Sequence, residues 1–159
     1  MLIFDGTIGA DIDIFLTRVR EETLFCTVML YEDWLATHSN CSNHHEDHPD
    51  GIVYLRVSPE IAFTRIQIHT LSSKSALSFD TIQQIYQQKE DLFIEKKNNP
   101  SLLQHLPVLV LNGNNDFQTD FAQFYNHLFY IKKFLKEIQD QKDISQGIYK
   151  EKTPHRHCC

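Results

Sequence analysis

One apolar run, followed at once by a proline, constrains the fold of this chain more than any other feature. Residues Ile52–Val57 are continuously rich in apolar side chains, which is the pattern of a strand buried on both faces of a sheet. Ser58 and Pro59 suit the cap and the first turn of a helix, and the charge of Glu60 is favourable there. The run therefore predicts a buried strand that passes directly into a helix ending at about His69.

Two further short apolar runs are typical of strands. Leu2–Phe4 stops at Gly6, and Pro107–Leu111 stops at the turn-forming cluster Asn112–Asn115. Helices are predicted over residues 11–35, with a break near 22–23, and over residues 79–97 and 120–139. Strands that alternate with helices indicate an α/β domain with a parallel sheet of about three strands.

Charge and hydropathy exclude some classes of protein. The 159 residues carry a net charge of −6, and the basic residues are scattered, which disfavours a nucleic-acid partner. The sequence has no long apolar stretch and no signal-peptide pattern, so we expect no membrane partner and a cytoplasmic chain with reduced cysteines. Residues 140–159 are polar and are expected to fray, which leaves residues 1–139 as the predicted domain.

Five sequence blocks occur in a fixed order along the chain. They are Phe4–Asp11 with Phe15, Tyr31–Trp34, Gly51–Glu60 with Arg65, Ile85–Phe93, and Leu106–Leu111 with Asn115–Phe117. In this order and spacing they resemble the motifs of the deoxynucleoside kinase family, over roughly residues 2–138. The resemblance implies part of a P-loop kinase-like three-layer fold, and ATP-dependent phosphorylation of a deoxynucleoside 5′-hydroxyl as the ancestral reaction.

The resemblance also implies roles for three acidic and aromatic residues near the start of the chain. Asp5 is implied as a ligand of Mg²⁺, a hard cation that prefers carboxylate oxygens. Asp11 and Phe15 are implied as substrate-binding residues, the first hydrogen-bonding the base and the second stacking on it. Their four-residue spacing places both on one helical face. For Phe15, packing in the core is an equally good interpretation.

Roles at the phosphate and cofactor sites follow in the same way. Arg65 is implied as the catalytic residue that remains in the lid, the loop that closes over the transferred phosphate. The loop of Asn115, Asp116 and Phe117 is implied as the cofactor-binding segment that contacts the adenine of ATP. ATP and Mg²⁺ are thus the implied cofactors, and a deoxynucleoside is the implied substrate.

Two phosphate-handling regions depart from the family's pattern. Gly6 stands where the family has an arginine, and after Arg65 the lid reads His69, Leu71 and Lys74 in place of arginines and a glutamate. None of the glycines is followed by Lys-Ser or Lys-Thr, as a phosphate loop requires. We therefore expect this chain, used alone, to be catalytically impaired, as a pseudoenzyme.

Other interpretations of the chain stay open. A second hypothesis is a non-catalytic protein that forms a homodimer or pairs with an intact kinase. Its candidate surface is the apolar stripe Phe121–Leu135, although packing on the sheet also explains that stripe. A third is a truncated gene or a misplaced start codon, which an in-frame phosphate loop upstream of Met1 would reveal.

Two points of structure are also open. Histidines and cysteines gather in Cys41–His48 and His155–Cys159, where zinc is one interpretation and simple solvation the stronger one. By resemblance, a strand that this chain lacks lies between the first two strands. Either those two strands pair directly, or their backbone groups need a partner or a further segment.

Overall fold

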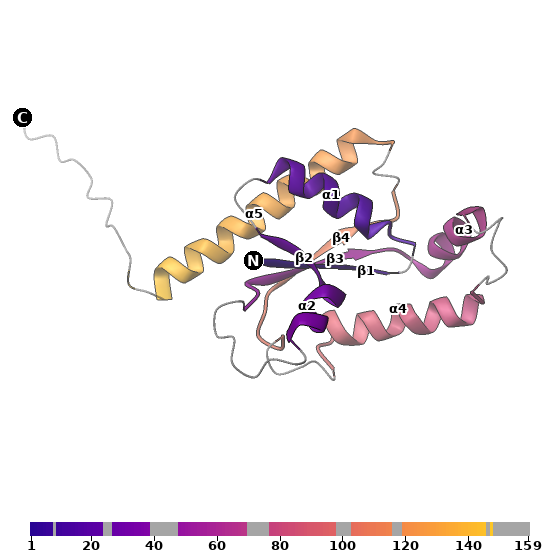
Figure 1. Cartoon of the computed structure of the whole chain (residues 1–159), viewed down its shortest axis with the longest axis horizontal. Coiled ribbons are helices and arrows are strands. Elements are labelled where there is room, and N and C mark those ends of the chain that lie inside the picture. Colours follow the sequence, from indigo (N-terminus) through magenta and orange to yellow (C-terminus); the bar gives the residue numbers. More distant parts are fainter. Residues whose placement is uncertain are drawn as a thin grey trace, which may run out of the picture.

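Four parallel strands form one sheet between two layers of helices in the computed structural model (Figure 1). The structure describes residues 1–7, 9–23, 27–38, 48–69, 77–97, 103–115, 119–145 and 147. The strands are β1 (Leu2–Gly6), β2 (Val28–Leu30), β3 (Gly51–Arg56) and β4 (Val108–Asn112), in the order β2-β1-β3-β4. The α/β class and the flanking helices are confirmed, with one more strand than expected.

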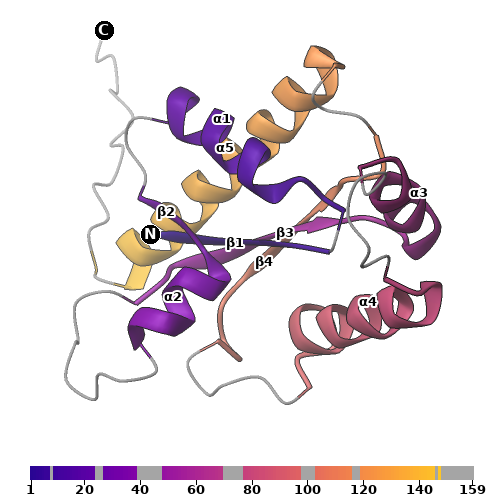
Figure 2. The ribbon, with the colours of Figure 1, turned by 45° about the vertical axis from the view of Figure 1, so that its right-hand side comes forward.

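The helices cover the two faces of the sheet in pairs. They are α1 (Ile12–Glu22), α2 (Tyr31–His38), α3 (Pro59–His69), α4 (Phe79–Phe93) and α5 (Phe121–Ser145). Helices α1 and α5 lie on one face, and α2 and α4 lie on the other (Figure 2). Helix α3 lies beyond the carboxyl end of β3, next to α4 (Figures 1 and 2).

The first and third strands of the chain pair directly. Their parallel register runs from Leu2 opposite Gly51 to Gly6 opposite Leu55. This is the first of the two arrangements that the sequence left open. The backbone groups between these strands are therefore satisfied within the chain.

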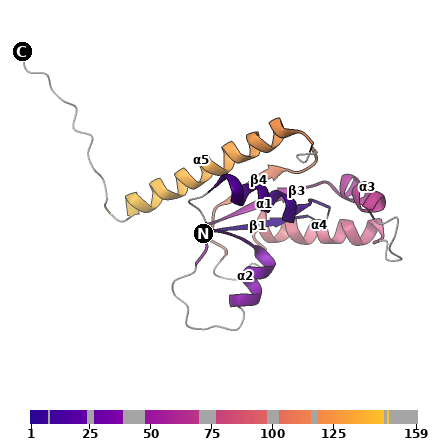
Figure 3. The same ribbon diagram turned by 45° about the horizontal axis from the view of Figure 1, so that its top comes forward.

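Alternate residues of the central strands feed two separate cores. Leu2, Phe4, Val53 and Leu55 join the cluster under α1 and α5, whereas Ile3, Ile52 and Tyr54 join the cluster over α2 and α4. Figure 3 shows α5 along one face of the sheet, with α2 and α4 along the other. A strand whose side chains are buried on both faces must be apolar throughout, and this is why the Ile52–Val57 run identified it.

The predicted helix over residues 11–35 is wrong in its middle. Helix α1 ends at Glu22, where the sequence predicts a break, but residues 28–30 form β2 and pair with β1. The amide of Leu2 also donates to the carbonyl of Thr27 at 2.9 Å. Pairing with a strand far away in sequence decides this segment, and a local helical pattern does not register such a contact.

The last helix is longer than predicted. The sequence predicts an end at Gln139, but α5 continues to Ser145. The side chain of Gln139 donates to Asp143 one turn later at 2.7 Å, and Lys142 Nζ lies 2.5 Å from an oxygen of Asp50. These polar contacts stabilise a segment without an apolar stripe, so the helix crosses the predicted domain boundary at residue 139.

The remaining boundaries follow the sequence closely. Helix α3 spans Pro59–His69 as predicted, and α4 begins after Ser78, whose hydroxyl accepts the amide of Thr81 at 3.1 Å. Helix α4 ends at Phe93, four residues early, and Lys96 in the turn beyond it has a left-handed backbone. No helix among the described residues is long and apolar enough to span a membrane.

Parts of the chain with sequence predictions lie outside the described residues. They are residues 70–76 of the lid, residues 41–47 of the first histidine and cysteine cluster, residues 116–118 of the implied adenine loop, and residues 148–159. The zinc hypothesis for both clusters therefore stays untested.

Candidate functional site

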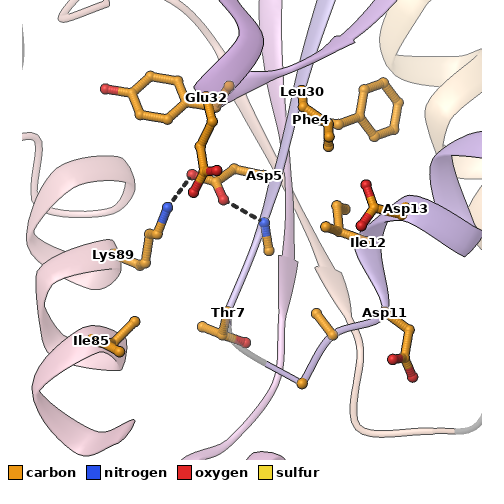
Figure 4. Close-up of a pocket in the computed structure, with 14 residues that line it drawn as sticks. Phe4, Asp5, Thr7, Asp11, Ile12, Asp13, Leu30, Glu32, Ile85 and Lys89 are labelled. Carbon is orange, nitrogen blue, oxygen red and sulfur yellow. Dashed lines mark hydrogen bonds and ion pairs between the residues drawn. The ribbon is translucent and has the colours of Figure 1, made fainter. Parts of the chain in front are cut away.

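A hollow of ≈ 490 Å³ opens beside the carboxyl end of β1 (Figure 4). Its walls are residues 4–7, residues 9–13, residues 30–32, Ile85 and Lys89. Ligands of open α/β sheets bind outside the carboxyl ends of the strands, so the hollow is the candidate site on position alone. Four carboxylates and one ammonium line it, among apolar side chains, which gives the hollow a net negative charge.

Asp5 is the most buried charge of the hollow, and protein donors hold both of its oxygens. One oxygen accepts the amide of Gly6 at 2.7 Å, and the other lies 2.5 Å from Nζ of Lys89 on α4 (Figure 4). Burial raises the pKa of Asp5, and the Lys89 ammonium offsets only part of that shift. Asp5 and Lys89 therefore form a partly desolvated ion pair in the wall of the hollow.

Asp5 does not fit the role of Mg²⁺ ligand that the resemblance implies. Mg²⁺ requires near-octahedral oxygen ligands and is usually held by one or two carboxylates with several waters. Both oxygens of Asp5 already accept hydrogen bonds, one of them from a cation. Within the part of the chain that the structure describes, no three His, Cys, Asp or Glu side chains gather as metal ligands would.

Asp11 lies in the wall of the same hollow, at the start of α1. Its backbone is left-handed, with φ 49° and ψ 43°, a conformation that Asp tolerates better than most residues. The Asp11 carbonyl accepts the amides of Ile14 and Phe15, while its side chain makes no capping hydrogen bond to the helix. This backbone conformation places Asp11 at the edge of the hollow, and unusual backbone conformations are often found at functional sites.

Phe15 lies elsewhere. Its side chain is fully buried, and its ring packs edge-on against Phe124 at 5.9 Å and against His127 at 5.8 Å. It does not line the hollow, although Asp11 is only one helical turn away. The structure thus brings Asp5 and Asp11 together and places Phe15 in the core, so its stacking on a base stays a prediction.

Arg65 binds backbone carbonyls. Its two terminal nitrogens donate to Gly9 at 3.2 Å, Gly113 at 2.9 Å, Asn114 at 2.9 Å and, more weakly, Asn115 at 3.4 Å. The guanidinium therefore ties α3 to the loops that follow β1 and β4. Asn115 takes part through its backbone, while Asp116 and Phe117 lie outside the described residues. The cofactor role of that loop stays a prediction.

Gly6 holds its position for a steric reason. A Cβ atom added there would lie 2.9 Å from Cβ of Ala10 and 3.4 Å from Cβ of Ile12. The turn after β1 thus packs closely against the backbone of Gly6, the position where the family has an arginine. A larger side chain at this position would require the turn to move.

Sequence reasoning missed Lys89 as part of the site. A signal for it exists, because Ile82, Ile85, Lys89 and Phe93 recur at helical spacing and Lys89 is the only charged member. A lysine on the buried face of a helix needs an opposite charge, and a carboxylate that ends a neighbouring strand supplies one.

A second polar cluster lies between α4 and β3. Glu90, which is 8% exposed, accepts the hydroxyl of Tyr54 at 3.1 Å and is paired with Arg56, whose Nε donates to Tyr86 at 3.0 Å. Burial, reinforced by the charge of Glu90, raises the pKa of Tyr54 well above its usual range. Every member of this cluster has a partner, so it fixes α4 on the sheet.

Comparison with known proteins points to one family. The family model described as deoxynucleoside kinase matches residues 1–138. The deoxycytidine kinase of Homo sapiens is 24% identical over 142 residues, and that of Mus musculus is 26% identical over 145 residues. Each match covers 87% of this chain and 53% of the relative.

A mitochondrial deoxyguanosine kinase of Xenopus laevis is 31% identical over 75 residues, which are 46% of this chain and 28% of that protein. The chain spans about half the length of the deoxycytidine kinases it matches. The family model covers most of the chain, and the sheet, helices and hollow are arranged as described above. The chain therefore belongs to the deoxynucleoside kinase family.

Proposed function

We propose that this chain binds a deoxynucleoside in the hollow beside β1 and does not, by itself, transfer phosphate to it. ATP and Mg²⁺ are then cofactors of the ancestral reaction only. We also propose the cytoplasm as its compartment, which agrees with the interpretation of the cysteines as reduced thiols.

The size and the charge of the hollow support binding of a nucleoside. Its volume of ≈ 490 Å³ is in the range of small-molecule sites. Asp11, Asp13 and Glu32 line it and can accept hydrogen bonds from base or sugar groups. The same carboxylates repel phosphate, so an uncharged nucleoside suits the hollow better than a nucleotide does. The names of the relatives, deoxycytidine kinase and deoxyguanosine kinase, agree with this class of ligand.

The contacts of Arg65 carry the second half of the proposal. Phosphoryl transfer needs cations directed at the transferred group, and Arg65 is the implied catalytic cation of the lid. Its guanidinium instead donates to backbone carbonyls of two loops, one containing Gly9 and the other residues 113–115. Lys89, the cation of the hollow, is paired with Asp5. These two cations therefore serve the scaffold and the wall of the hollow.

Calorimetric titration with each of the four deoxynucleosides, and a kinase assay with ATP and Mg²⁺, test the two halves separately. We expect at least one deoxynucleoside to bind, and turnover to stay at background. Asp11→Asn should weaken that binding about tenfold, because a hydrogen bond to a charged group is lost.

The matched control for Asp11→Asn is Asp33→Asn, which removes an exposed carboxylate of α2 outside the hollow. Its affinity should equal that of the wild type. Failure of every deoxynucleoside to bind would contradict the binding half. Turnover well above background would contradict the non-catalytic half and leave the binding half standing.

A second candidate function, that of a non-catalytic binding partner, draws support from one face of α5. Phe121, Tyr125 and Phe129 recur every four residues, and each is more than half exposed. The stripe expected from the sequence packs mostly on the sheet, since Phe124 and Leu128 are buried there. The exposed aromatic row is a different face of the same helix, and a large exposed apolar patch is typical of an interface.

Light scattering after size-exclusion chromatography tests this second function. A homodimer would give twice the chain mass, and Phe129→Lys would convert it to the monomer. Gln84→Lys, at an exposed position of α4, is the control for the added charge. A strict monomer that also fails to bind an intact kinase of the family would rule this function out.

A further inference from the structure

The contacts of Lys89 show a side chain fixed on several sides. Its ammonium lies 2.5 Å from Oδ2 of Asp5, 5.6 Å from the ring centroid of Tyr31 and 5.8 Å from that of Phe93. The two rings come from α2 and α4, so three elements surround the charge. Cation–π contacts at this range strengthen when the cation is partly desolvated, and Lys89 is only 20% exposed. Lys89 is therefore built into the wall of the hollow.

The backbone around Lys89 is fixed as well. The next residue, Glu90, bonds to Tyr54 and pairs with Arg56, both on the neighbouring strand β3. This places the start of the Lys89 side chain relative to the sheet. The ammonium therefore stays at Asp5 without the help of a ligand, and no conformational change is needed to bring it there.

A second carboxylate, that of Glu32, lines the same hollow, but its side chain is exposed. In Figure 4 the Lys89 ammonium is joined to Asp5 alone. The Glu32 charge contributes to the raised pKa of Asp5, which agrees with their proximity. Two neighbouring carboxylates are a usual protein contribution to a Mg²⁺ or Mn²⁺ site, with waters as the other ligands. Here the amine of Lys89 already occupies one side of Asp5, where such an ion would bind.

The geometry points to Lys89 as a tethered cation that takes the place of a divalent metal at Asp5, so that the hollow receives its ligand without a metal ion. Binding of a ligand without a metal ion rests on the proposed function. The replacement of the metal rests only on the contacts of Lys89. A divalent ion placed against Asp5 would repel the ammonium at close range, and these two charges cannot share the site.

Titration of the full chain with MnCl₂ tests whether Lys89 replaces a divalent metal. Free Mn²⁺ is measured by electron paramagnetic resonance. Lys89→Met keeps the length of the side chain and removes its charge. We expect this variant to bind one Mn²⁺ about tenfold or more tightly than the wild type, because the carboxylate of Asp5 is then free to bind a solvent ion. In Asp5→Asn with Lys89→Met the gain should disappear.

The matched control is Lys133→Met, which removes an exposed lysine of α5 far from the hollow in sequence and should leave Mn²⁺ affinity unchanged. A folded Lys89→Met chain with no gain in affinity overturns the inference. So does a wild type that already binds Mn²⁺ as tightly as the variant and loses that binding in Asp5→Asn.

A measurement on the wild type alone covers the case in which Lys89→Met does not fold. The ammonium resonance of Lys89 in a ¹⁵N-labelled chain should be observable as a slowly exchanging, hydrogen-bonded group and should persist in millimolar MnCl₂. Selective loss of that resonance on addition of Mn²⁺ overturns the inference. These titrations contain no nucleoside, so their outcome is independent of whether the hollow binds one.

Binding of the ligand without a metal ion has its own test. The affinity for whichever deoxynucleoside binds should be the same in EDTA and in MgCl₂. Binding that requires Mg²⁺ overturns this part of the inference. Absence of any nucleoside binding is instead a failure of the proposed function, and the Mn²⁺ titration still decides the role of Lys89.

Discussion

Two adjacent residues of α4 form ion pairs of opposite polarity with two adjacent strands, and only one of the pairs faces the hollow. Lys89 meets Asp5 of β1, whereas Glu90 meets Arg56 of β3 and the hydroxyl of Tyr54. The Glu90 cluster lies between helix and sheet. The Lys89 pair is in the wall of a cavity. The same kind of contact therefore serves the scaffold in one place and lines the candidate site in the other.

The two pairs differ in what depends on each charge, because the carboxylates are buried alike: the side chain of Glu90 is 10% exposed and that of Asp5 is 9%. Removal of Glu90 leaves the hydroxyl of the fully buried Tyr54 without its acceptor. Removal of Lys89 leaves Asp5 in the wall of the hollow, where water or a proton can compensate its charge. We therefore expect changes at Glu90 to affect folding most, and changes at Lys89 to affect the site most.

The largest effect is expected for Glu90→Ala. It leaves the hydroxyl of Tyr54 without its acceptor and Arg56 without its carboxylate, and we expect a loss of about 2–4 kcal/mol in the free energy of unfolding. Urea denaturation followed by circular dichroism measures it. Asp91→Ala is the matched control, since its pair with Lys97 at 3.7 Å is more exposed and contributes less than about 1 kcal/mol. Equal losses in both variants would contradict the comparison.

A smaller effect is expected for the pair in the hollow. Lys89→Met alone should lower the free energy of unfolding by about 1–2 kcal/mol, because Asp5 remains buried without its ammonium. Asp5→Asn with Lys89→Met should recover most of that loss, since no unpaired charge remains. The same urea titrations give the coupling energy through a double-mutant cycle. Independent, additive losses would show that the two side chains do not interact.

Burial of a titratable group in the core also gives the direction in which stability changes with pH. His127 is 4% exposed, and burial lowers its pKa, which a backbone contact with Asn112 offsets only in part. The unfolded chain therefore binds the proton first as pH falls, so stability is full above pH ~6.5 and declines below it. His127→Phe should flatten this part of the profile, measured by urea titration at a series of pH values. An unchanged profile in the variant would assign the decline to other groups.

The smallest effect is expected at the surface. Lys142→Ala removes a half-exposed contact to Asp50 and should cost less than about 1 kcal/mol. The variant tests what holds the last turns of α5. If the contact with Asp50 holds them, amide hydrogen exchange of residues 140–145 should become faster in the variant. Lys132→Ala, on the same helix, is the control and should leave that exchange unchanged.

The sequence predicts most of the fold because its strands are buried on both faces. The run Ile52–Val57 and the capped helix after it are visible locally, and both are confirmed. Strand β2 is not visible, because its three residues lie within a helical pattern and are fixed by pairing with β1. The length of α5 was underestimated for a similar reason, since its end is held by contacts with a distant loop.

The site is predicted less completely. The family resemblance identifies Asp5 and Asp11, and the structure brings them to one hollow. It does not reveal what Arg65 binds, because backbone carbonyls of distant loops leave no mark in the sequence. Nor does it reveal Lys89, whose role depends on a carboxylate 84 residues away. Local pattern gives the residue, and tertiary contact gives its partner.

The direct ladder between β1 and β3 has a consequence for complementation by a second polypeptide. A strand supplied in trans, for instance one that carries a phosphate loop, could enter the middle of the sheet only after five registered residue pairs had separated. That opening would expose two cores at once, since each central strand is buried on both sides. Reconstitution by mixing folded pieces should therefore be slow, while co-expression, in which both pieces fold together, avoids the barrier.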